Sequence, residues 1–126
     1  WYMSTAGMIF LDRSNHENAM RSMRNAGNEI KKGKNIISFP EGTRSKTNQI
    51  GQFKRGSFII AKEGKIPIVP VAIKGSNQIN PSGTLTIRKG IIKTKIGKPI
   101  YHKDEETTES FANRTRKEVE LMVNSL

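Results

Sequence analysis

The chain has 126 residues, and its 22 Lys and Arg against 11 Asp and Glu give a net charge of +11. This length suits one domain with a core of its own, and the charge favours anionic partners such as nucleic acid, an acidic membrane face or phosphorylated substrates. The absence of cysteine excludes disulfides and thiolate metal sites, and two histidines leave little room for a zinc site built on imidazole.

The first third of the chain alternates strand and helix patterns. Gly7 to Asp12 (GMIFLD) is predicted as a short buried strand, and Asn35 to Phe39 (NIISF) as the next one. Between them, apolar residues recur at helical spacing behind a capping box formed by Ser14 and Glu17, and Gly33 ends the helix. A strand, a helix and a strand form a βαβ unit, which implies a parallel sheet covered by helices.

The middle of the chain continues this alternation. A polar loop, Lys46 to Gln52, precedes a predicted helix over Phe53 to Glu63. Ile66 to Ile73 is apolar almost throughout, as in a strand covered on both faces. Pro67 and Pro70 cannot donate to a sheet ladder, so part of this strand is expected to be irregular or at an edge.

The last third predicts a hairpin and a helix. Thr84 to Arg88 and Ile91 to Ile96 alternate in polarity around a Lys89-Gly90 turn. The last helix is expected to be led by acidic residues, which suits the helix dipole, and to have a narrow apolar stripe. The acidic residues are Asp104, Glu105, Glu106 and Glu109, and the stripe is Phe111, Thr115, Val119 and Met122. The predicted fold class is α/β, a mostly parallel sheet flanked by helices with an incomplete N-terminal part.

The segment Phe39 to Ser45 (FPEGTRS) directly follows the second predicted strand. Gly42 in a turn lets backbone N–H groups approach a ligand. Arg44 offers a planar fork to a phosphate, and Glu41 can hold that fork in place. The same residues also suit an ordinary turn in which Pro40 ends the strand and Arg44 is solvated. From the residues alone, an anion site and a plain turn remain equally open.

Several segments resemble sequence blocks of the glycerolphosphate acyltransferase family, which includes the 1-acylglycerol-3-phosphate acyltransferases. FPEGTRS resembles the third block. Gly7 to Arg13 (GMIFLDR) resembles the second block, G-x-x-F-I-D-R, with Leu11 in place of isoleucine. Ile66 to Val71 (IPIVPV) resembles the fourth, and Phe53 to Gly56 (FKRG) resembles the family's F-K-x-G. The blocks occur in the family's order, and the resemblance extends to about Pro99.

The resemblance implies both a reaction and a site. In the family, the histidine of an H-x-x-x-x-D block acts as general base on a glycerol hydroxyl, which attacks an acyl thioester of coenzyme A or acyl carrier protein. The arginines of the second and third blocks bind the acceptor's phosphate. The phosphate-binding residues implied here are Arg13, Glu41, Gly42, Thr43, Arg44 and Lys54. For Lys54, a solvated position at a helix start is an equally open interpretation. No metal and no cofactor beyond the donor thioester are implied.

The H-x-x-x-x-D block itself does not occur in the chain. His16 is followed at that spacing by Arg21, and His102 by Thr107. His16 is therefore interpreted as a polar residue in a first helical turn. In the family the block precedes the G-x-x-F-I-D-R segment, so the catalytic His and Asp are expected upstream of Trp1. Residues 1–126 are then the C-terminal part of a single acyltransferase domain, inactive alone.

The predicted function is transfer of a fatty acyl group from acyl-CoA or acyl carrier protein to 1-acylglycerol 3-phosphate. Glycerol 3-phosphate or another lysophospholipid remains open as acceptor. An anionic membrane surface is the other expected partner, with the protein on the cytoplasmic face, peripheral or anchored through a missing N-terminal segment. The alternative is a basic nucleic-acid-binding module. Only 6% of the residues are aromatic and no RNA-recognition or helix-turn-helix pattern occurs, so nucleic acid is not expected.

Overall fold

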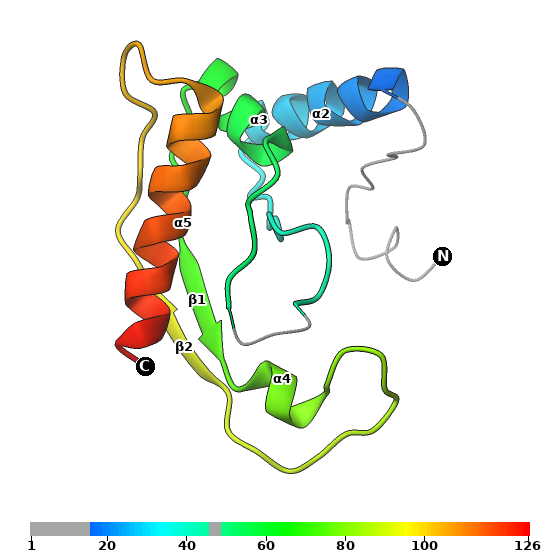
Figure 1. Cartoon of the computed structure of the whole chain (residues 1–126). Coiled ribbons are helices and arrows are strands. Elements are labelled where there is room, and N and C mark those ends of the chain that lie inside the picture. Colours follow the sequence, from blue (N-terminus) through cyan, green and yellow to red (C-terminus); the bar gives the residue numbers. More distant parts are fainter. Residues whose placement is uncertain (1–15, 46–48) are drawn as a thin grey trace. The chain divides into compact units, whose positions relative to one another are not determined.

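The structure, a computed structural model, describes residues 16–45 and 49–126. The chain separates into two compact units, residues 1–38 and 39–126. The predicted strand Gly7 to Asp12 lies outside the described residues. The described part of the first unit holds helix α2, and that of the second holds α3, β1, α4, β2 and α5 in chain order (Figure 1).

Helix α2 spans His16–Lys31 and confirms the helix predicted from the apolar spacing. It ends in a Schellman motif, in which Lys34 N–H donates to Glu29 O at 3.2 Å and Gly33 N–H donates to Ile30 O at 2.8 Å. Gly33 has φ +85°, a left-handed conformation that glycine adopts without steric cost. The predicted C-terminal stop at Gly33 is therefore confirmed.

The strand predicted over Asn35 to Phe39 is wrong, because residues 34–39 are irregular chain. An extended apolar segment becomes a strand only when a neighbouring strand takes up its N–H and C=O groups. No strand pairs with this segment among residues 16–45 and 49–126.

Strands β1 (Val71–Lys74) and β2 (Lys93–Ile96) form an antiparallel pair in which Val71 lies opposite Ile96 and Lys74 opposite Lys93. The pairing described is thus antiparallel, where the βαβ pattern had predicted a mostly parallel sheet. An isolated bridge between Ile68 and Ile100 extends the pair beyond Pro70. The irregularity predicted at the prolines is confirmed, since the continuous ladder begins only after Pro70.

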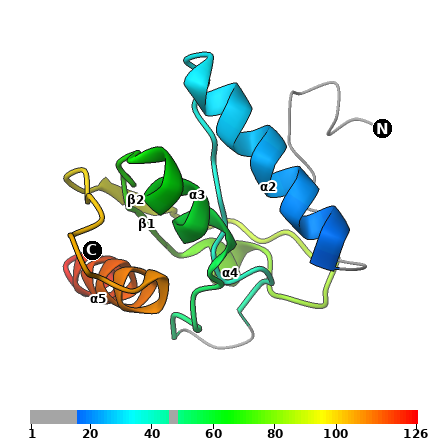
Figure 2. The same cartoon turned by 90° about the horizontal axis from the view of Figure 1, so that it is seen from above.

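Helix α5 (Thr108–Asn124) packs along β1 (Figures 1 and 2). Ala72 on β1 is fully buried. Three lysine ammonium groups reach the end of α5: Lys74 donates to Val123 O at 3.4 Å, Lys93 to Leu126 O at 2.8 Å and Lys95 to Ser125 Oγ at 2.8 Å. Cations are favourable at a helix C-terminus because its carbonyls carry the negative end of the dipole. This placement ties the strand pair to α5.

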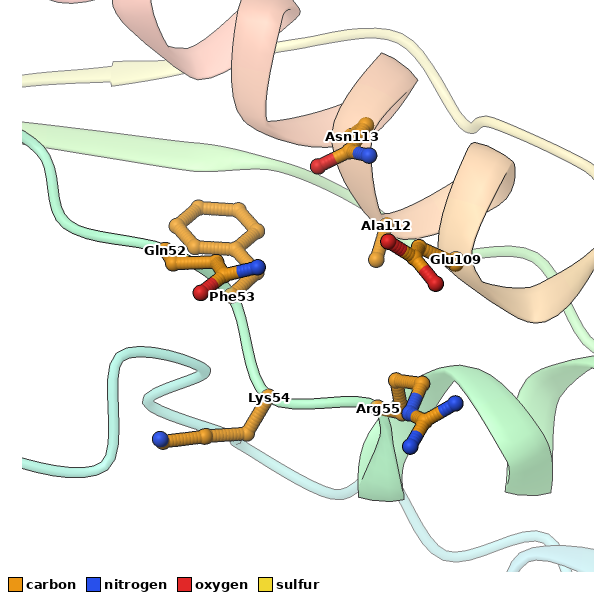
Figure 3. A pocket seen from close by; sticks show the side chains of 7 residues that line it. All are labelled: Gln52, Phe53, Lys54, Arg55, Glu109, Ala112 and Asn113. Atoms are coloured by element: carbon orange, nitrogen blue, oxygen red, sulfur yellow. The ribbon is translucent and has the colours of Figure 1, made fainter.

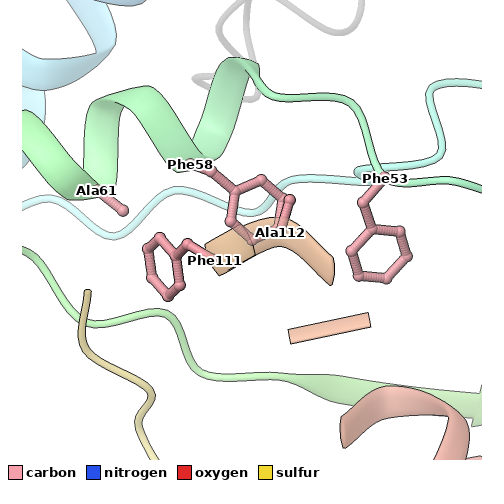
Figure 4. Packing of buried hydrophobic residues seen from close by; sticks show 5 residues of the cluster. All are labelled: Phe53, Phe58, Ala61, Phe111 and Ala112. Atoms are coloured by element: carbon pink, nitrogen blue, oxygen red, sulfur yellow. The ribbon is translucent and has the colours of Figure 1, made fainter. Parts of the chain in front are cut away.

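The core of the second unit lies between α3 (Gly56–Gly64) and α5 (Figure 4). Phe58 meets Phe111 edge to face at 5.4 Å between ring centroids, and Phe53 stacks on Phe58 at 6.1 Å. Ala61 and Ala112 complete the cluster. Each favourable aromatic pair adds about 0.5–1.5 kcal/mol beyond the burial of its area. Of the predicted stripe of α5, Phe111, Thr115 and Met122 are buried, and Val119 packs against the cluster.

The predicted hairpin is wrong. Residues 84–88 form no strand, and β2 pairs with β1 instead. Alternating polarity indicates an extended segment but does not identify its partner. The predicted helix over Phe53 to Glu63 starts later, at Gly56, because Phe53 precedes the helix and enters the core. Asp104, Glu105 and Glu106 lie before α5 and not within it. Glu105 has φ +62°, which breaks a helical path.

Candidate functional site

A tight turn forms the start of the FPEGTRS segment. The N–H of Gly42 donates to Phe39 O at 3.0 Å, with Pro40 and Glu41 between them. Proline at the second position and glycine at the fourth position are common in such a four-residue turn. Gly42 has φ +72°. The Gly42 N–H that sequence reasoning offered to a ligand is thus used within the turn. What this glycine supplies is the left-handed conformation that sends the chain on to Thr43 and Arg44.

The carboxylate of Glu41 holds this turn against the following loop. Its Oε2 accepts the N–H of Gly51 at 2.8 Å. A Cβ atom at position 51 would lie 2.9 Å from the same oxygen, so only glycine lets the carboxylate approach so closely. No ion pair joins Glu41 to Arg44 among the described residues. Gly51 is a site residue that sequence reasoning missed, because nothing in a polar loop marks one glycine as a contact for a carboxylate ten positions earlier.

Thr43 and Arg44 follow the turn and are exposed to solvent. Within the described part of the chain, Arg44 forms neither a hydrogen bond nor an ion pair. Next to them, Ser45 Oγ donates to Gln49 O at 3.1 Å. The turn therefore presents a guanidinium group whose donors are available to a phosphate or carboxylate. Arg13, the other predicted phosphate ligand, lies outside the described residues.

Lys54 is linked to the turn through its backbone. Its N–H donates to Pro40 O at 2.7 Å, so the segment that precedes α3 runs beside the FPEGTRS turn. The same segment lines a pocket of about 310 Å³, whose opposite wall is the start of α5 (Figure 3). The lining residues are Gln52, Phe53, Lys54, Arg55, Glu109, Ala112 and Asn113.

The pocket has mixed polarity. Arg55 and Glu109 lie on facing walls, Asn113 and Gln52 add amide groups, and Phe53 supplies an apolar side (Figure 3). The lining includes two cations, Lys54 and Arg55, and one carboxylate, Glu109.

The start of α5 is fixed by a cap and by an ion pair. Thr107 Oγ1 accepts the N–H of Ser110 at 3.1 Å. Arg114 donates to both carboxylate oxygens of Glu106, at 2.8 and 2.7 Å, and to Tyr101 O at 2.8 Å. The hydrogen bond from Arg114 lowers the pKa of Glu106 to about 2. This clamp holds the pocket's α5 wall, and it was not predicted because Glu106 was expected inside the helix.

His102 takes part in the same packing. Its ring meets Phe111 edge to face at 5.6 Å, and Nε2 lies 2.6 Å from Glu106 O. These contacts make His102 part of the packing around Phe111. His16 is the first residue of α2, as predicted. Among residues 16–45 and 49–126, no three His, Asp or Glu side chains gather as a metal site, and no helix is long and apolar enough to cross a membrane.

Comparison with known proteins decides the family. The model of the family described as Acyltransferase matches residues 1–74, which is more than half of the chain and includes the FPEGTRS turn. The chain belongs to the acyltransferase family. The resemblance inferred from the sequence blocks is thereby confirmed.

Two relatives of this acyltransferase chain are named for the same activity. The chain is 37% identical over 102 residues to the chloroplastic 1-acyl-sn-glycerol-3-phosphate acyltransferase BAT2 of Brassica napus, covering 80% of this chain and 30% of that protein. It is 34% identical over 131 aligned positions to the 1-acyl-sn-glycerol-3-phosphate acyltransferase of Saccharomyces cerevisiae, covering 100% of this chain and 42% of that protein.

A solved structure is also similar. The crystal structure of the 1-acyl-sn-glycerophosphate acyltransferase PlsC from Thermotoga maritima matches with a TM-score of 0.84 at 31% identity, over 99% of this chain and 49% of that one. The α/β fold class is thereby confirmed. The chain spans less than half the length of each of these three proteins.

Proposed function

We propose that this chain is part of an enzyme that transfers a fatty acyl group from an acyl thioester to the free hydroxyl of 1-acylglycerol 3-phosphate. In that reaction the hydroxyl oxygen bonds to the thioester carbonyl carbon, its proton passes to a general base, and the thiol leaves. The donor is acyl-CoA or acyl-acyl carrier protein. The names of the relatives support this acceptor.

The proposal is carried by Arg44, which is exposed and has no partner within residues 16–45 and 49–126, and by the turn before it, which is fixed from two sides. Glu41 anchors the turn to Gly51, and Pro40 O accepts the N–H of Lys54. The turn that precedes Arg44 is therefore held in place before any ligand binds. An ordered anchor reduces the entropy lost when the guanidinium binds a phosphate. Arg44 thus binds the acceptor's phosphate, and Lys54, whose N–H donates to Pro40 O, extends the cationic surface beside the turn. Arg13 stays a prediction.

The proposed acceptor suggests where in the cell the protein acts. A lysophospholipid resides in a membrane, and a net charge of +11 favours an anionic membrane surface. We therefore propose that the protein acts at the cytoplasmic face of a membrane. This location is tested by fractionation of cells that express the full-length protein.

The test of the proposed function is a thioester-release assay on the full-length protein with lysophosphatidate as acceptor. A charge-assisted contact contributes about 1.5–3 kcal/mol, so Arg44→Ala should raise KM for the acceptor about ten- to hundredfold. Arg44→Lys should restore part of the affinity, because an ammonium group replaces the charge but not the fork.

The matched control is Arg24→Ala, which removes an exposed arginine from α2 and should leave KM unchanged. Wild-type KM in Arg44→Ala would refute the phosphate role of the turn. Absence of thioester release by the wild-type protein with any lysophospholipid would refute the reaction itself.

A further inference from the structure

The loop of residues 80–92 presents large aliphatic side chains to solvent. It leaves α4 (Ser76–Ile79) in a wide excursion and returns as β2 (Figure 1). Leu85 is fully exposed, and Ile87 and Ile91 are each 77% exposed. Ile92 is half exposed. Four such side chains within eight residues form an apolar patch of the kind that marks contact with another molecule or with a membrane.

The second half of this loop is held against α4 and the residue before it. Arg88 N–H donates to Ile79 O at 2.8 Å. Gly90 lies so close to Ile79 that a Cβ atom would come within 2.7 Å of its side chain, and a Cβ atom at Gly75 would come within 2.2 Å of Ile91 O. These contacts fix residues 88–91 against α4, and Leu85 and Ile87 lie directly before them.

The strand pair and the loop between its strands carry positive charge only. Residues 71–96 contain no Asp or Glu. They contain five cations, all exposed: Lys74, Arg88, Lys89, Lys93 and Lys95. Arg88 and Lys89 stand between the exposed aliphatic residues. A surface of this composition complements one that is both apolar and anionic.

Two classes of partner are anionic, and the aliphatic residues separate them. Nucleic acid is bound by cations together with aromatic side chains that stack on bases, and residues 80–92 contain no aromatic residue. A lipid surface instead takes up aliphatic side chains at the boundary of headgroups and acyl chains, with Lys and Arg on the anionic headgroups.

We propose that the 80–92 loop is a membrane-contact element, which inserts Leu85, Ile87 and Ile91 into the interface of a bilayer and places Arg88 and Lys89 on anionic headgroups. This proposal deepens the proposed function and rests on it for the choice of partner, because a lysophosphatidate acceptor resides in such a bilayer. The loop holds the enzyme at the surface from which its acceptor comes.

A dye at a single position tests this contact even if other parts of the full-length protein bind membranes. The chain contains no cysteine, so Leu85→Cys adds one labelling site once any other cysteine of the full-length protein is replaced. On addition of phosphatidylglycerol-containing vesicles, an environment-sensitive dye at position 85 should shift to the blue and be quenched by quencher-bearing lipid. The control is the same dye on Leu121→Cys, a 66% exposed position on α5, which should not respond.

Charge and specificity are tested in the same assay. Each Lys or Arg near an anionic surface contributes about fivefold in affinity, so Arg88→Gln with Lys89→Gln should raise the lipid concentration for half-maximal response about thirtyfold. An unchanged dye at position 85 under conditions where the protein sediments with vesicles would overturn the proposal, as would a response to DNA in place of lipid. Turnover of a short-chain, water-soluble lysophosphatidate tests the proposed function separately, since it requires no bilayer.

Discussion

Replacing Glu106 with glutamine keeps the shape of the side chain and removes its charge. In the folded protein this carboxylate accepts two hydrogen bonds from Arg114 and one from the N–H of Lys103 at 3.1 Å, and the side chain is only 8% exposed. Hydrogen bonds to charged groups contribute about 1.5–3 kcal/mol. Glutamine retains one acceptor, and Arg114 is a third exposed, so we expect a loss of about 2 kcal/mol in the free energy of unfolding.

The measurement is thermal unfolding followed by circular dichroism. For a chain of this size, a loss of about 2 kcal/mol corresponds to a fall in Tm of roughly 8 °C. The matched control is Glu120→Gln, which removes the charge of an i,i+4 pair with Arg116 on the surface of α5. Such pairs contribute about 0.3–0.5 kcal/mol, so this control should shift Tm by no more than about 2 °C.

The effect should depend on pH. The hydrogen bond from Arg114 is the main reason that the pKa of Glu106 falls from 4.5 to about 2 on folding. Between these values the unfolded chain takes up a proton that the folded protein does not. The stabilisation is therefore complete above about pH 4.5 and is lost as the pH falls towards 2. A Tm difference between wild type and Glu106→Gln that is equal at pH 7 and pH 2.5, or equal losses in the two variants, would refute the clamp.

Three further changes test the frame of the site. Gly51→Ala should displace the Glu41 carboxylate and raise KM for the acceptor with little change in Tm; an unchanged KM would contradict the role of this contact. Phe111→Ala should lower the free energy of unfolding by about 4 kcal/mol in denaturant titration, because the side chain is fully buried against Phe58. Thr107→Ala should cost about 1 kcal/mol in the same titration through loss of the N-cap of α5, and Thr107→Ser should restore it.

Features of the fold that depend on local signals were predicted from the sequence. The end of α2 at Gly33 follows from the φ that only glycine adopts readily, and the inner face of α5 follows from the spacing of Phe111, Thr115 and Met122. The irregular start of β1 follows from the missing N–H of Pro70. Each of these features is specified by residues that lie close together in the sequence.

Features that depend on distant partners were not predicted. Residues 84–88 alternate like a strand, yet the partner of β2 is β1, about twenty residues earlier. Glu106 was expected at the start of the helix, whereas it precedes α5 and its carboxylate binds Arg114, eight residues later within α5. Polarity patterns specify which face of a segment is apolar, and the pairing depends on which segments the rest of the fold brings together.

The candidate site divides in the same way. The position and exposure of Arg44 follow from the turn residues, so they could be predicted. The tether from Glu41 to Gly51 and the pocket wall formed by α5 join segments that no periodicity connects. Sequence reasoning therefore identified the exposed guanidinium group and missed the contacts that hold its backbone.

The structure separates the residue proposed to bind the phosphate from those that hold the frame, and this separation decides what each variant means. Arg44 has no partner among the described residues, so its removal leaves no buried group unsatisfied and should leave Tm unchanged. The Glu106 side chain is 8% exposed and paired with Arg114, and it is distant in sequence from the turn, so its loss should lower Tm and leave KM nearly unchanged well below the unfolding temperature. An Arg44 variant that loses stability, or a Glu106 variant that loses acceptor affinity while fully folded, would show that the turn and the clamp are coupled.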